Sequence, residues 1–275
     1  MKHVDIIVLN WNGWNDTINC INSLKKQNYT NFSLIVVDNN SSDDSVYQIK
    51  KTLPSVELLQ TEANLGFGGG CNVGIKHALS RGADYVWLIN SDSIADPNAL
   101  SSLVHVANQD VRLGSVGSVL YEADSTDQIQ LWGGGNVKLW SGQSHHRLYP
   151  GAIDFISGAS LLLRCTAIKE VGLFDQSAFF MYWEDTDLAF RLRAVGWQLA
   201  VAHDSHVWHK QSASLGKRSP LLDEYFTQSG VRFLKRHAPI PFISIFLMLS
   251  RMLLKRLAMG EFNRTKAVFK GFLKA

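Results

Sequence analysis

Strand-like apolar segments alternate with helix-patterned segments along the first 95 residues, and this alternation constrains the fold more than any other feature. The apolar runs are nearly continuous, as in strands buried on both faces of a parallel sheet, and cover residues 4–10, 32–38, 56–59 and 85–90. The intervening segments carry apolar residues at helical spacing, at residues 16–27, 45–53 and 71–80. The pattern predicts an α/β fold with a doubly wound, mostly parallel sheet flanked by helices.

The second half of the chain is less regular. Residues 133–135 and 141–146 are glycine-rich or polar and are expected to form loops. A strand is expected at 198–202, and residues 188–195 are expected to form a helix that Gly196 ends.

Polar residues follow three of the predicted strands, where ligands bind in sheets of this kind. The substrate or nucleotide site is therefore expected to include Asn10, Asn12, Asp38, Asn40 and Asn90. Asp38 has two interpretations. Its carboxylate could accept a hydrogen bond from a nucleobase N–H, or it could only terminate its strand through an Asx-turn.

A glycine-rich segment, residues 64–72, precedes the helix expected at 71–80. Glycines let a backbone approach a bulky anion, and a helix N-terminus offers free N–H groups, so Asn64, Gly66, Gly69 and Asn72 are candidate binding residues. The dinucleotide fingerprint G-x-G-x-x-G fails here in both possible registers, which argues against an NAD enzyme. A glycine-rich turn without a ligand is the alternative.

Asp92, within Asn90-Ser91-Asp92-Ser93, is a candidate metal ligand, because Mg²⁺ and Mn²⁺ sites use one or two carboxylates together with phosphate oxygens. Helix capping is the alternative, but Asp96-Pro97 already provides a helix start. Three histidines follow at three-residue intervals, His203, His206 and His209. An extended chain turns alternate residues to opposite sides, so a zinc site made of all three is not expected.

Three carboxylates, Glu184, Asp185 and Asp187, follow an aromatic run that ends at Trp183. Acidic residues stabilise the first turn of a helix whether or not they do chemistry. Clustered carboxylates also raise one another's pKa, which suits a general base. The aromatic residues could stack on a sugar or belong to the core.

Bulk composition limits compartment and partners. Three widely spaced cysteines and the absence of an N-terminal apolar run suit a cytoplasmic protein. The net charge is +3, yet residues 251–275 hold seven basic and one acidic residue, so the rest of the chain is near −3 and no nucleic-acid partner is expected. The apolar run that starts at Phe242 is too short to span a membrane. It predicts a basic amphipathic helix that lies on the inner face of the membrane, packs on the domain or forms a homodimer contact.

Taken together, these motifs resemble the family 2 glycosyltransferases with the GT-A fold, especially their rhamnosyltransferase-like branch, over about residues 4–237. The matching segments are residues 7–13, 37–43, 64–72, 157–159, 172–175, 184–187 and 207–214. The resemblance implies a Rossmann-like GT-A domain at 1–237, with a nucleotide-sugar half at 1–95 and an acceptor half at 96–237. A helical tail would occupy 238–275.

The resemblance also implies an inverting transfer from an NDP-sugar to a saccharide or lipid-linked saccharide, in the synthesis of a bacterial surface polysaccharide. Asp185 would be the catalytic base, Trp183 and Glu184 would support substrate binding, and Asp92 with His209 would hold Mg²⁺ or Mn²⁺. Rhamnose is the expected donor sugar. Two departures from the family pattern stand out: Asn90 replaces the first aspartate of the metal motif, and the Arg-Asn pair is altered at residues 228–230.

Two other classes compete with this interpretation. A catalytically silent nucleotide-sugar-binding protein would explain the loss of an aspartate at Asn90. A sugar nucleotidyltransferase would use a similar sheet, but residues 11–14 lack the basic residue expected in its phosphate-binding loop.

Overall fold

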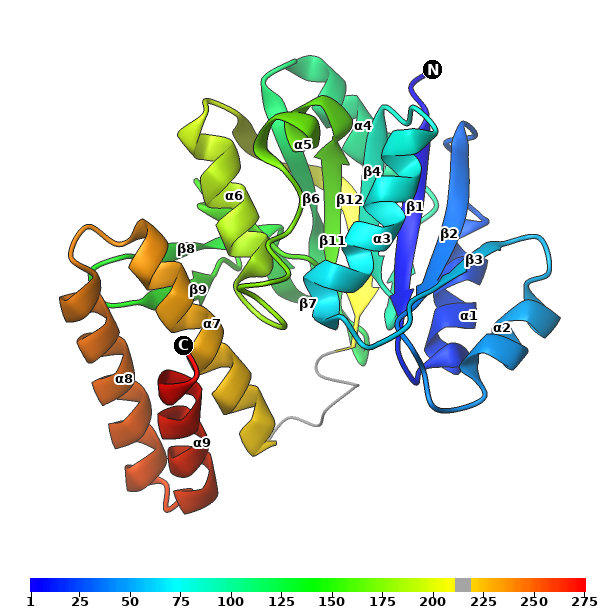
Figure 1. Cartoon of the computed structure of the whole chain (residues 1–275). Coiled ribbons are helices and arrows are strands. Elements are labelled where there is room, and N and C mark those ends of the chain that lie inside the picture. Colours follow the sequence, from blue (N-terminus) through cyan, green and yellow to red (C-terminus); the bar gives the residue numbers. More distant parts are fainter. Residues whose placement is uncertain (211–218) are drawn as a thin grey trace.

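A mixed sheet of nine strands organises the computed structural model, which describes residues 1–210 and 219–275 (Figure 1). The strand order is β3-β2-β1-β4-β11-β6-β12-β5, and β7 pairs with β6. The end of the predicted histidine motif, residues 211–214, lies outside the described residues.

The four strands predicted in the first half form the parallel part of the sheet. Their bounds are β1 Val4–Asn10, β2 Phe32–Asp38, β3 Glu57–Gln60 and β4 Tyr85–Asn90. In the register of this sheet, Asn10 pairs with Asp38, and Leu9 pairs with Asn90. The polar residues that end the three strands therefore meet at one edge, as the sequence predicted.

The second half continues the sheet with antiparallel pairs of β4 with β11, β11 with β6 and β12 with β5, whereas β6 and β12 run parallel. The bounds are β5 Ser93–Ala95, β6 Leu113–Glu122, β7 Ser125–Trp132, β11 Ser160–Arg164 and β12 Gln198–His209. The strand expected at 198–202 thus extends to His209, with a bulge between Ala202 and His206.

A small second sheet corrects the loops expected at 133–135 and 141–146. It contains β10, β8 and β9, with bounds Phe155–Ile156, Gly134–Lys138 and Gln143–His146. Glycine is required where β8 meets β10, because a Cβ at Gly134 would lie 1.8 Å from the carbonyl oxygen of Phe155. The glycines here mark a close backbone approach rather than a loop.

Helices cover both faces of the large sheet. The core on one face is built with α1 Trp14–Leu24, α2 Ser45–Thr52 and α4 Ala99–Gln109. The core on the other face is built with α3 Gly66–Ser80, α5 Cys165–Val171 and α6 Glu184–Ala194. This arrangement confirms the predicted α/β class.

The helix expected at 71–80 begins five residues earlier, at Gly66, so residues 66–72 of the glycine-rich segment form about its first two turns rather than a loop before it. Gly66 has a φ of +71°, and a Cβ there would lie 2.0 Å from the carbonyl oxygen of Phe180. A Cβ at Gly70 would lie 2.4 Å from Leu9 Cδ1 of β1. These glycines therefore let α3 pack closely on neighbouring backbone and on β1.

Three helices at one end of the molecule complete the chain (Figure 1). They are α7 Pro220–His237, α8 Pro241–Ala258 and α9 Phe262–Leu273, and a third apolar cluster joins α7 and α8 to Phe179 and Trp183. The predicted C-terminal helical extension is therefore present. None of the helices formed by residues 1–210 and 219–275 has the length and apolar character to cross a membrane.

Candidate active site

A cavity of about 480 Å³ opens at the carboxyl ends of β1 and β4 and is bordered by the first turn of α6. Seven of the predicted site residues line it: Asn64, Gly66, Asn90, Asp92, Glu184, Asp185 and His209. Its wall also contains aromatic side chains that can stack on rings: Trp11, Phe67, Phe180, Tyr182 and Tyr225. The cavity is therefore a mixed polar and aromatic site that draws on both halves of the chain.

Asn90, Asp92 and His209 lie together because β5 and β12 form an antiparallel pair in which Ser93 faces His209. The His209 Nε2 atom is 3.4 Å from Asp92 Oδ1 and 3.1 Å from Asn90 Nδ2. Its Nδ1 atom is 2.8 Å from Gln130 Oε1. Since the amide oxygen of Gln130 can only accept, Nδ1 is the donor in that bond, and Nε2 is the ring atom that faces the Asn90 amide and the Asp92 carboxylate.

These donors suit a hard divalent cation as a partial ligand set. A carboxylate and an imidazole nitrogen are present, and a hydrogen-bonded second nitrogen is the usual way to orient a metal-binding histidine. No group of three histidine, cysteine or acidic residues with metal-binding geometry occurs within residues 1–210 and 219–275. A cation bound here would need phosphate oxygens or water to complete its shell.

The other two histidines have different surroundings. His203 lies edge-on to Trp132 at 5.2 Å between ring centroids, and His206 lies edge-on to Tyr121 at the same separation. The three rings therefore diverge along β12, in line with the expectation that they do not share one zinc ion.

Asn10 and Asp38 form a buried network behind the cavity. Asn10 Nδ2 donates to Asp38 Oδ1 at 2.7 Å, and Asn10 Oδ1 accepts from Thr17 Oγ1 at 2.7 Å. Ser41 donates from its Oγ and backbone N to the two Asp38 oxygens at 2.6 and 3.1 Å. Both residues join β1 to the turn after β2 and do not line the cavity. This geometry matches the Asx-turn alternative, and nucleobase binding by Asp38 stays a prediction.

Asn12 and Asn40 shape the turns beside this network. Both have positive φ, of 52° and 60°, a conformation that asparagine tolerates better than most residues. Asn12 Oδ1 accepts from the backbone N–H of Ser42 at 2.7 Å. Neither residue lines the cavity, so their substrate contacts also stay predictions.

Asn39 is a functional candidate that the sequence analysis missed. It lines the cavity, is 2% exposed, and donates from Nδ2 to Asn64 Oδ1 at 3.0 Å and to the Gly66 carbonyl at 3.1 Å. Asn39 Oδ1 accepts from the Leu65 N–H. The asparagine thus fixes the start of α3 against the end of β2, and its place next to Asp38 was the only available signal.

Gly69 and Asn72 lie outside the cavity, on the buried side of α3. Asn72 exchanges two hydrogen bonds with the backbone of Phe174, donating to its carbonyl at 2.8 Å and accepting from its N–H at 3.1 Å. A Cβ at Gly69 would lie 2.7 Å from Leu65 Cβ. The structure gives both residues a packing role, and substrate binding by them stays a prediction.

Asp185 is the half-buried carboxylate of the cavity, and three donors fix it. Gly158 N donates to its Oδ2 at 2.9 Å, and the N and Oγ1 atoms of Thr186 donate to its Oδ1 at 2.6 and 3.1 Å. Burial raises the pKa of Asp185, although these donors oppose the rise. The result is an oriented carboxylate with increased basicity.

Glu184 lies beside Asp185 and is almost completely buried, at 6% exposure. Its Oε2 atom has no hydrogen-bond partner among the described residues. Burial, and then the charge of Asp185, raise the pKa of Glu184 above its ordinary value. A neutral carboxylic acid at this position could donate a hydrogen bond into the cavity.

The backbone ahead of α6 is strained, because Tyr182 and Trp183 have φ of 68° and 69° in succession. Ser229 Oγ of α7 donates to the Met181 carbonyl at 2.8 Å, and the Trp183 ring packs on Phe233 at 4.7 Å between centroids. This conformation directs Tyr182 into the cavity, whereas Trp183 lies in the core outside it. The structure gives Trp183 a packing role, and its contact with substrate stays a prediction.

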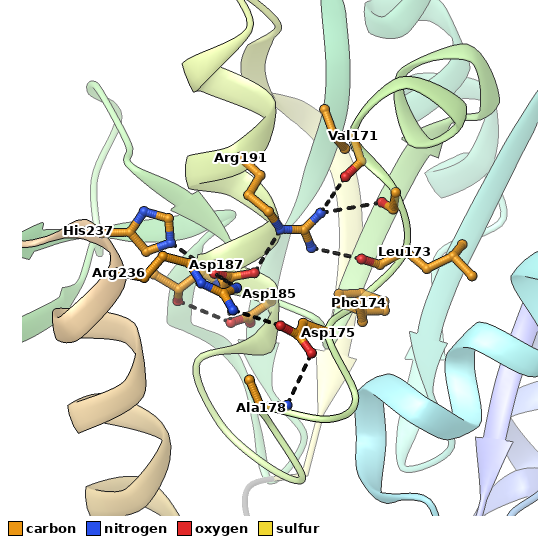
Figure 2. Close-up of polar contacts among 12 residues, drawn as sticks. Val171, Leu173, Phe174, Asp175, Ala178, Asp185, Asp187, Arg191, Arg236 and His237 are labelled. Atoms are coloured by element: carbon orange, nitrogen blue, oxygen red, sulfur yellow. Dashed lines mark hydrogen bonds and ion pairs between the residues drawn. The ribbon is translucent and has the colours of Figure 1, made fainter. Parts of the chain in front are cut away.

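The third acid of the cluster, Asp187, serves a different purpose. It is fully buried, and it accepts hydrogen bonds at 2.8 Å from Arg191 Nε, Arg236 Nη1 and His237 Nε2 (Figure 2). Arg236 also binds Asp175 at 2.7 Å. Burial alone would raise the pKa of Asp187, but the bonds from His237 and Arg191 outweigh it, and the pKa is lowered. The ionised Asp187 therefore ties α6 to α7.

Comparisons with known proteins agree with this architecture. Residues 5–172 match the family model described as "Glycosyl transferase family 2". An N-acetylglucosaminyl-diphospho-decaprenol L-rhamnosyltransferase from Mycobacterium tuberculosis is 31% identical over 211 residues, which cover 67% of this chain and 68% of that protein.

Two solved structures share the fold. A mannosyltransferase from Pyrobaculum calidifontis in complex with GDP-Man and Mn²⁺ has a TM-score of 0.63 and 16% identity, covering 98% of this chain and 73% of its own. A structure of GalNAc-T7 with UDP, GalNAc and Mn²⁺ has a TM-score of 0.71 and 14% identity, covering 97% of this chain and 54% of its own.

The mixed sheet, the flanking helices and these structural matches define the GT-A fold, and the family model and the mycobacterial relative define the class as a glycosyltransferase. The chain belongs to glycosyltransferase family 2, and its similarity to the mycobacterial enzyme places it in the rhamnosyltransferase-like branch. The predicted fold class, family and enzyme class are all confirmed.

Replacing Asp187 by Asn should destabilise the protein by about 3 kcal/mol, because it leaves the Arg191 and Arg236 cations without their buried counter-ion. The wild type should lose this contribution as the pH falls through the lowered pKa of Asp187, since a depressed carboxyl pKa stabilises the fold only while the group is ionised. Chemical denaturation at neutral and acidic pH measures both effects. Asp84→Asn, which removes an exposed ion pair with Lys2, is the control and should change stability far less. An equal loss in the two variants would contradict the structural role of Asp187.

Replacing Glu184 by Gln should stabilise the protein at alkaline pH. The pKa of Glu184 is higher in the folded protein than in the unfolded chain. Between these two pKa values the unfolded chain loses its proton more readily, so the free energy of unfolding falls as the pH rises. The variant should gain on the order of 2 kcal/mol over the wild type at pH 8, and little at pH 5. Thermal unfolding at the two pH values tests this, and a gain that does not depend on pH would contradict it.

Proposed function

We propose that the protein is an inverting glycosyltransferase that moves a sugar from a nucleoside diphosphate sugar to a hydroxyl group of a saccharide or lipid-linked saccharide. One observation carries the proposal: the oriented Asp185 carboxylate shares a cavity with the Asp92–His209 pair. The first is suited to accept a proton, and the second is suited to a cation that binds a diphosphate.

Asp185 is the proposed general base. In a single displacement, it takes the proton of the acceptor hydroxyl while the hydroxyl oxygen bonds to the anomeric carbon and the nucleoside diphosphate leaves. The donors from Gly158 and Thr186 hold the carboxylate in place, so little reorganisation is needed when it accepts the proton. Its raised pKa increases its affinity for that proton.

Asp92 and His209 are the proposed ligands of Mg²⁺ or Mn²⁺, with Asn90 next to them. A cation held there would supply Lewis-acid stabilisation of the leaving diphosphate. The two fold neighbours were solved with Mn²⁺, which supports the cation but leaves its identity open for this chain. The Asn90 amide contributes no charge, so the site should hold its cation less tightly than one with two carboxylates.

The proposed donor is an activated rhamnose, with dTDP-rhamnose first and UDP-sugars next, and the proposed acceptor is lipid-linked. The name of the mycobacterial relative specifies both an L-rhamnosyl donor group and a decaprenol-linked acceptor, which supports these two choices. The product would then serve the synthesis of a bacterial surface polysaccharide. Trp11, Tyr182 and Tyr225 offer the cavity's flat faces for the sugar rings.

The proposed division of labour follows the chain. Residues 1–95 would bind the nucleotide sugar, residues 96–237 would bind the acceptor, and residues 238–275 would contact the inner face of the membrane. A homodimer stays a prediction. A catalytically silent sugar-nucleotide-binding protein is the second candidate, because Asn90 stands where the family's metal motif has a carboxylate.

Asp185→Asn should lower transfer by about 10²- to 10⁴-fold, the usual contribution of a positioned general base, while donor binding is kept. A thermal-shift panel of nucleoside diphosphates and NDP-sugars measures binding, since a ligand of the native state raises the unfolding temperature. Release of nucleoside diphosphate, with and without acceptor, measures turnover. Asp110→Asn, at a surface pair with Arg112, is the control. Parallel loss of binding and turnover would mean that Asp185 is structural, and a wild type that binds donors without any turnover would favour the silent protein.

Asp92→Asn and His209→Ala should each raise the Mn²⁺ concentration needed for half-maximal activity by roughly tenfold or more, because each removes one of the few protein ligands. Chelation with EDTA should stop wild-type turnover, and added Mn²⁺ should restore it. His203→Ala is the matched control, because its ring packs on Trp132 away from Asp92. If all three variants need the same Mn²⁺ concentration for half-maximal activity, Asp92 and His209 are not ligands of the cation.

A further inference from the structure

Helix α8 has its polar side turned toward the protein. Ser244 is fully buried, and the Arg251 guanidinium donates to the carbonyl oxygens of Ser141 and Gly142, in the turn between β8 and β9. Ile245 and Met248 on the same side join the apolar cluster with α7. The sequence left open whether this helix packs on the domain or lies on a membrane, and the structure shows that the side with Ser244, Met248 and Arg251 packs on the domain.

The opposite side of α8 is apolar and exposed. Phe242 is 88% exposed, Phe246 68% and Leu254 66%, and the stripe is completed by Ile243, Leu247 and Leu257. At 100° per residue, these six positions cover about 140° of the helix surface. A soluble surface helix normally has the reverse arrangement, so this stripe is matched to an apolar environment.

Helix α9 extends the same kind of surface. Its Ala267, Val268 and Gly271 are buried, and a Cβ at Gly271 would lie 2.3 Å from the Glu224 carbonyl of α7. Its other side exposes four large apolar side chains, Phe262, Phe269, Phe272 and Leu273. Figure 1 shows α8 and α9 next to each other at the end of the molecule, far from α1 and α2. We call the exposed apolar residues of the two helices the α8–α9 face.

The charges around the α8–α9 face indicate what covers it. Residues 251–275 hold seven basic residues and one acidic residue. Arg256 and Arg264 are paired with Asp223 and Glu261. Lys270 and Lys274 are paired with Glu224. Lys266, on the same side of α9 as Phe262 and Phe269, is exposed and has no carboxylate partner in the part of the chain that the structure describes. Apolar side chains next to a free ammonium group, in a segment of net positive charge, fit a layer that is apolar inside and anionic at its surface.

We propose that the α8–α9 face docks the protein on the surface of a bilayer that contains anionic lipids. The aromatic and aliphatic side chains enter the boundary between headgroups and acyl chains, and Lys266 binds a lipid phosphate. This docking adds a membrane surface to the proposed function, and it rests on that function only in the assumption that the acceptor is lipid-linked. Both helices pack on α7, and α7 supplies Leu221 and Tyr225 to the cavity wall. Docking would therefore hold the cavity next to the surface in which such an acceptor is anchored.

Vesicle co-sedimentation of the full chain tests the proposal, with vesicles of phosphatidylcholine alone and of phosphatidylcholine with phosphatidylglycerol. The wild type should bind the anionic vesicles more tightly, and added salt should weaken the binding. The double variant Phe242→Asp/Phe246→Asp should lose at least tenfold in vesicle affinity. Lys266→Glu should lose about tenfold, and only on anionic vesicles. Tyr47→Asp is the matched control, because Tyr47 is 62% exposed on α2 at the other end of the molecule.

Three results would overturn the docking proposal. The first is a wild type that binds neither kind of vesicle. The second is a control variant that loses as much binding as the α8–α9 variants. The third is a dimer, seen by light scattering, that the phenylalanine variants dissociate, because a second copy of the chain would then cover the face. Phe262→Asp/Phe269→Asp on α9 provides an independent pair if the α8 variant does not fold. Release of nucleoside diphosphate in the absence of vesicles should be unchanged in these variants. Vesicle binding by a protein without turnover would count against the proposed function and leave the docking intact.

Discussion

The buried carboxylate of Asp187 is the interaction on which the geometry of the site depends. A charge without solvent is tolerated only when donors surround it, and Arg191, Arg236 and His237 provide them from α6 and α7. Arg191 continues the connection by donating to the carbonyls of Val171 and Leu173 (Figure 2). One side chain therefore fixes the start of α6 relative to α7 and to the segment after α5, and the cavity acids on that helix turn take their positions from it.

Local sequence pattern was sufficient for the parallel half of the sheet. Strands buried on both faces consist of apolar runs, so β1, β2 and β4 have the predicted bounds. The pattern predicted the wrong structure where glycines let two backbone segments approach each other closely. Residues 133–135 and 141–146 look like loops, but they pair with each other and with β10. The pairing of β8 with β10 is a long-range contact that composition does not encode, and the close packing that starts α3 early at Gly66 also depends on a distant residue, Phe180.

The candidate site was predictable in its location and less so in its details. The carboxyl ends of β1 and β4 lie together because sheet topology requires it. The acidic cluster joins them because α6 packs on β10 and Asp185 accepts a hydrogen bond from Gly158 N–H. Which side chains face the cavity depends on packing partners far away in sequence. Trp183 turns to α7 and Asn72 binds the backbone of Phe174, whereas Asn39, which no motif singled out, lies in the cavity wall.

The positions of Glu184, Asp185 and Asp187 in the sequence also determine in which direction each side chain points around the axis of α6. Successive helical residues are 100° apart, so Glu184 and Asp185 reach the cavity while Asp187 points toward α7. Deleting one residue from the segment that precedes Glu184 would turn the whole set by that angle. Thr186 would then take the place of Asp185, and Leu188 would face the cations of α7 in place of Asp187. Insertions and deletions in the segment before α6 should thus be rarer in evolution than substitutions within it. In a sequence alignment, a gap misplaced by one residue in this segment would assign the role of Asp185 to Glu184 or to Thr186.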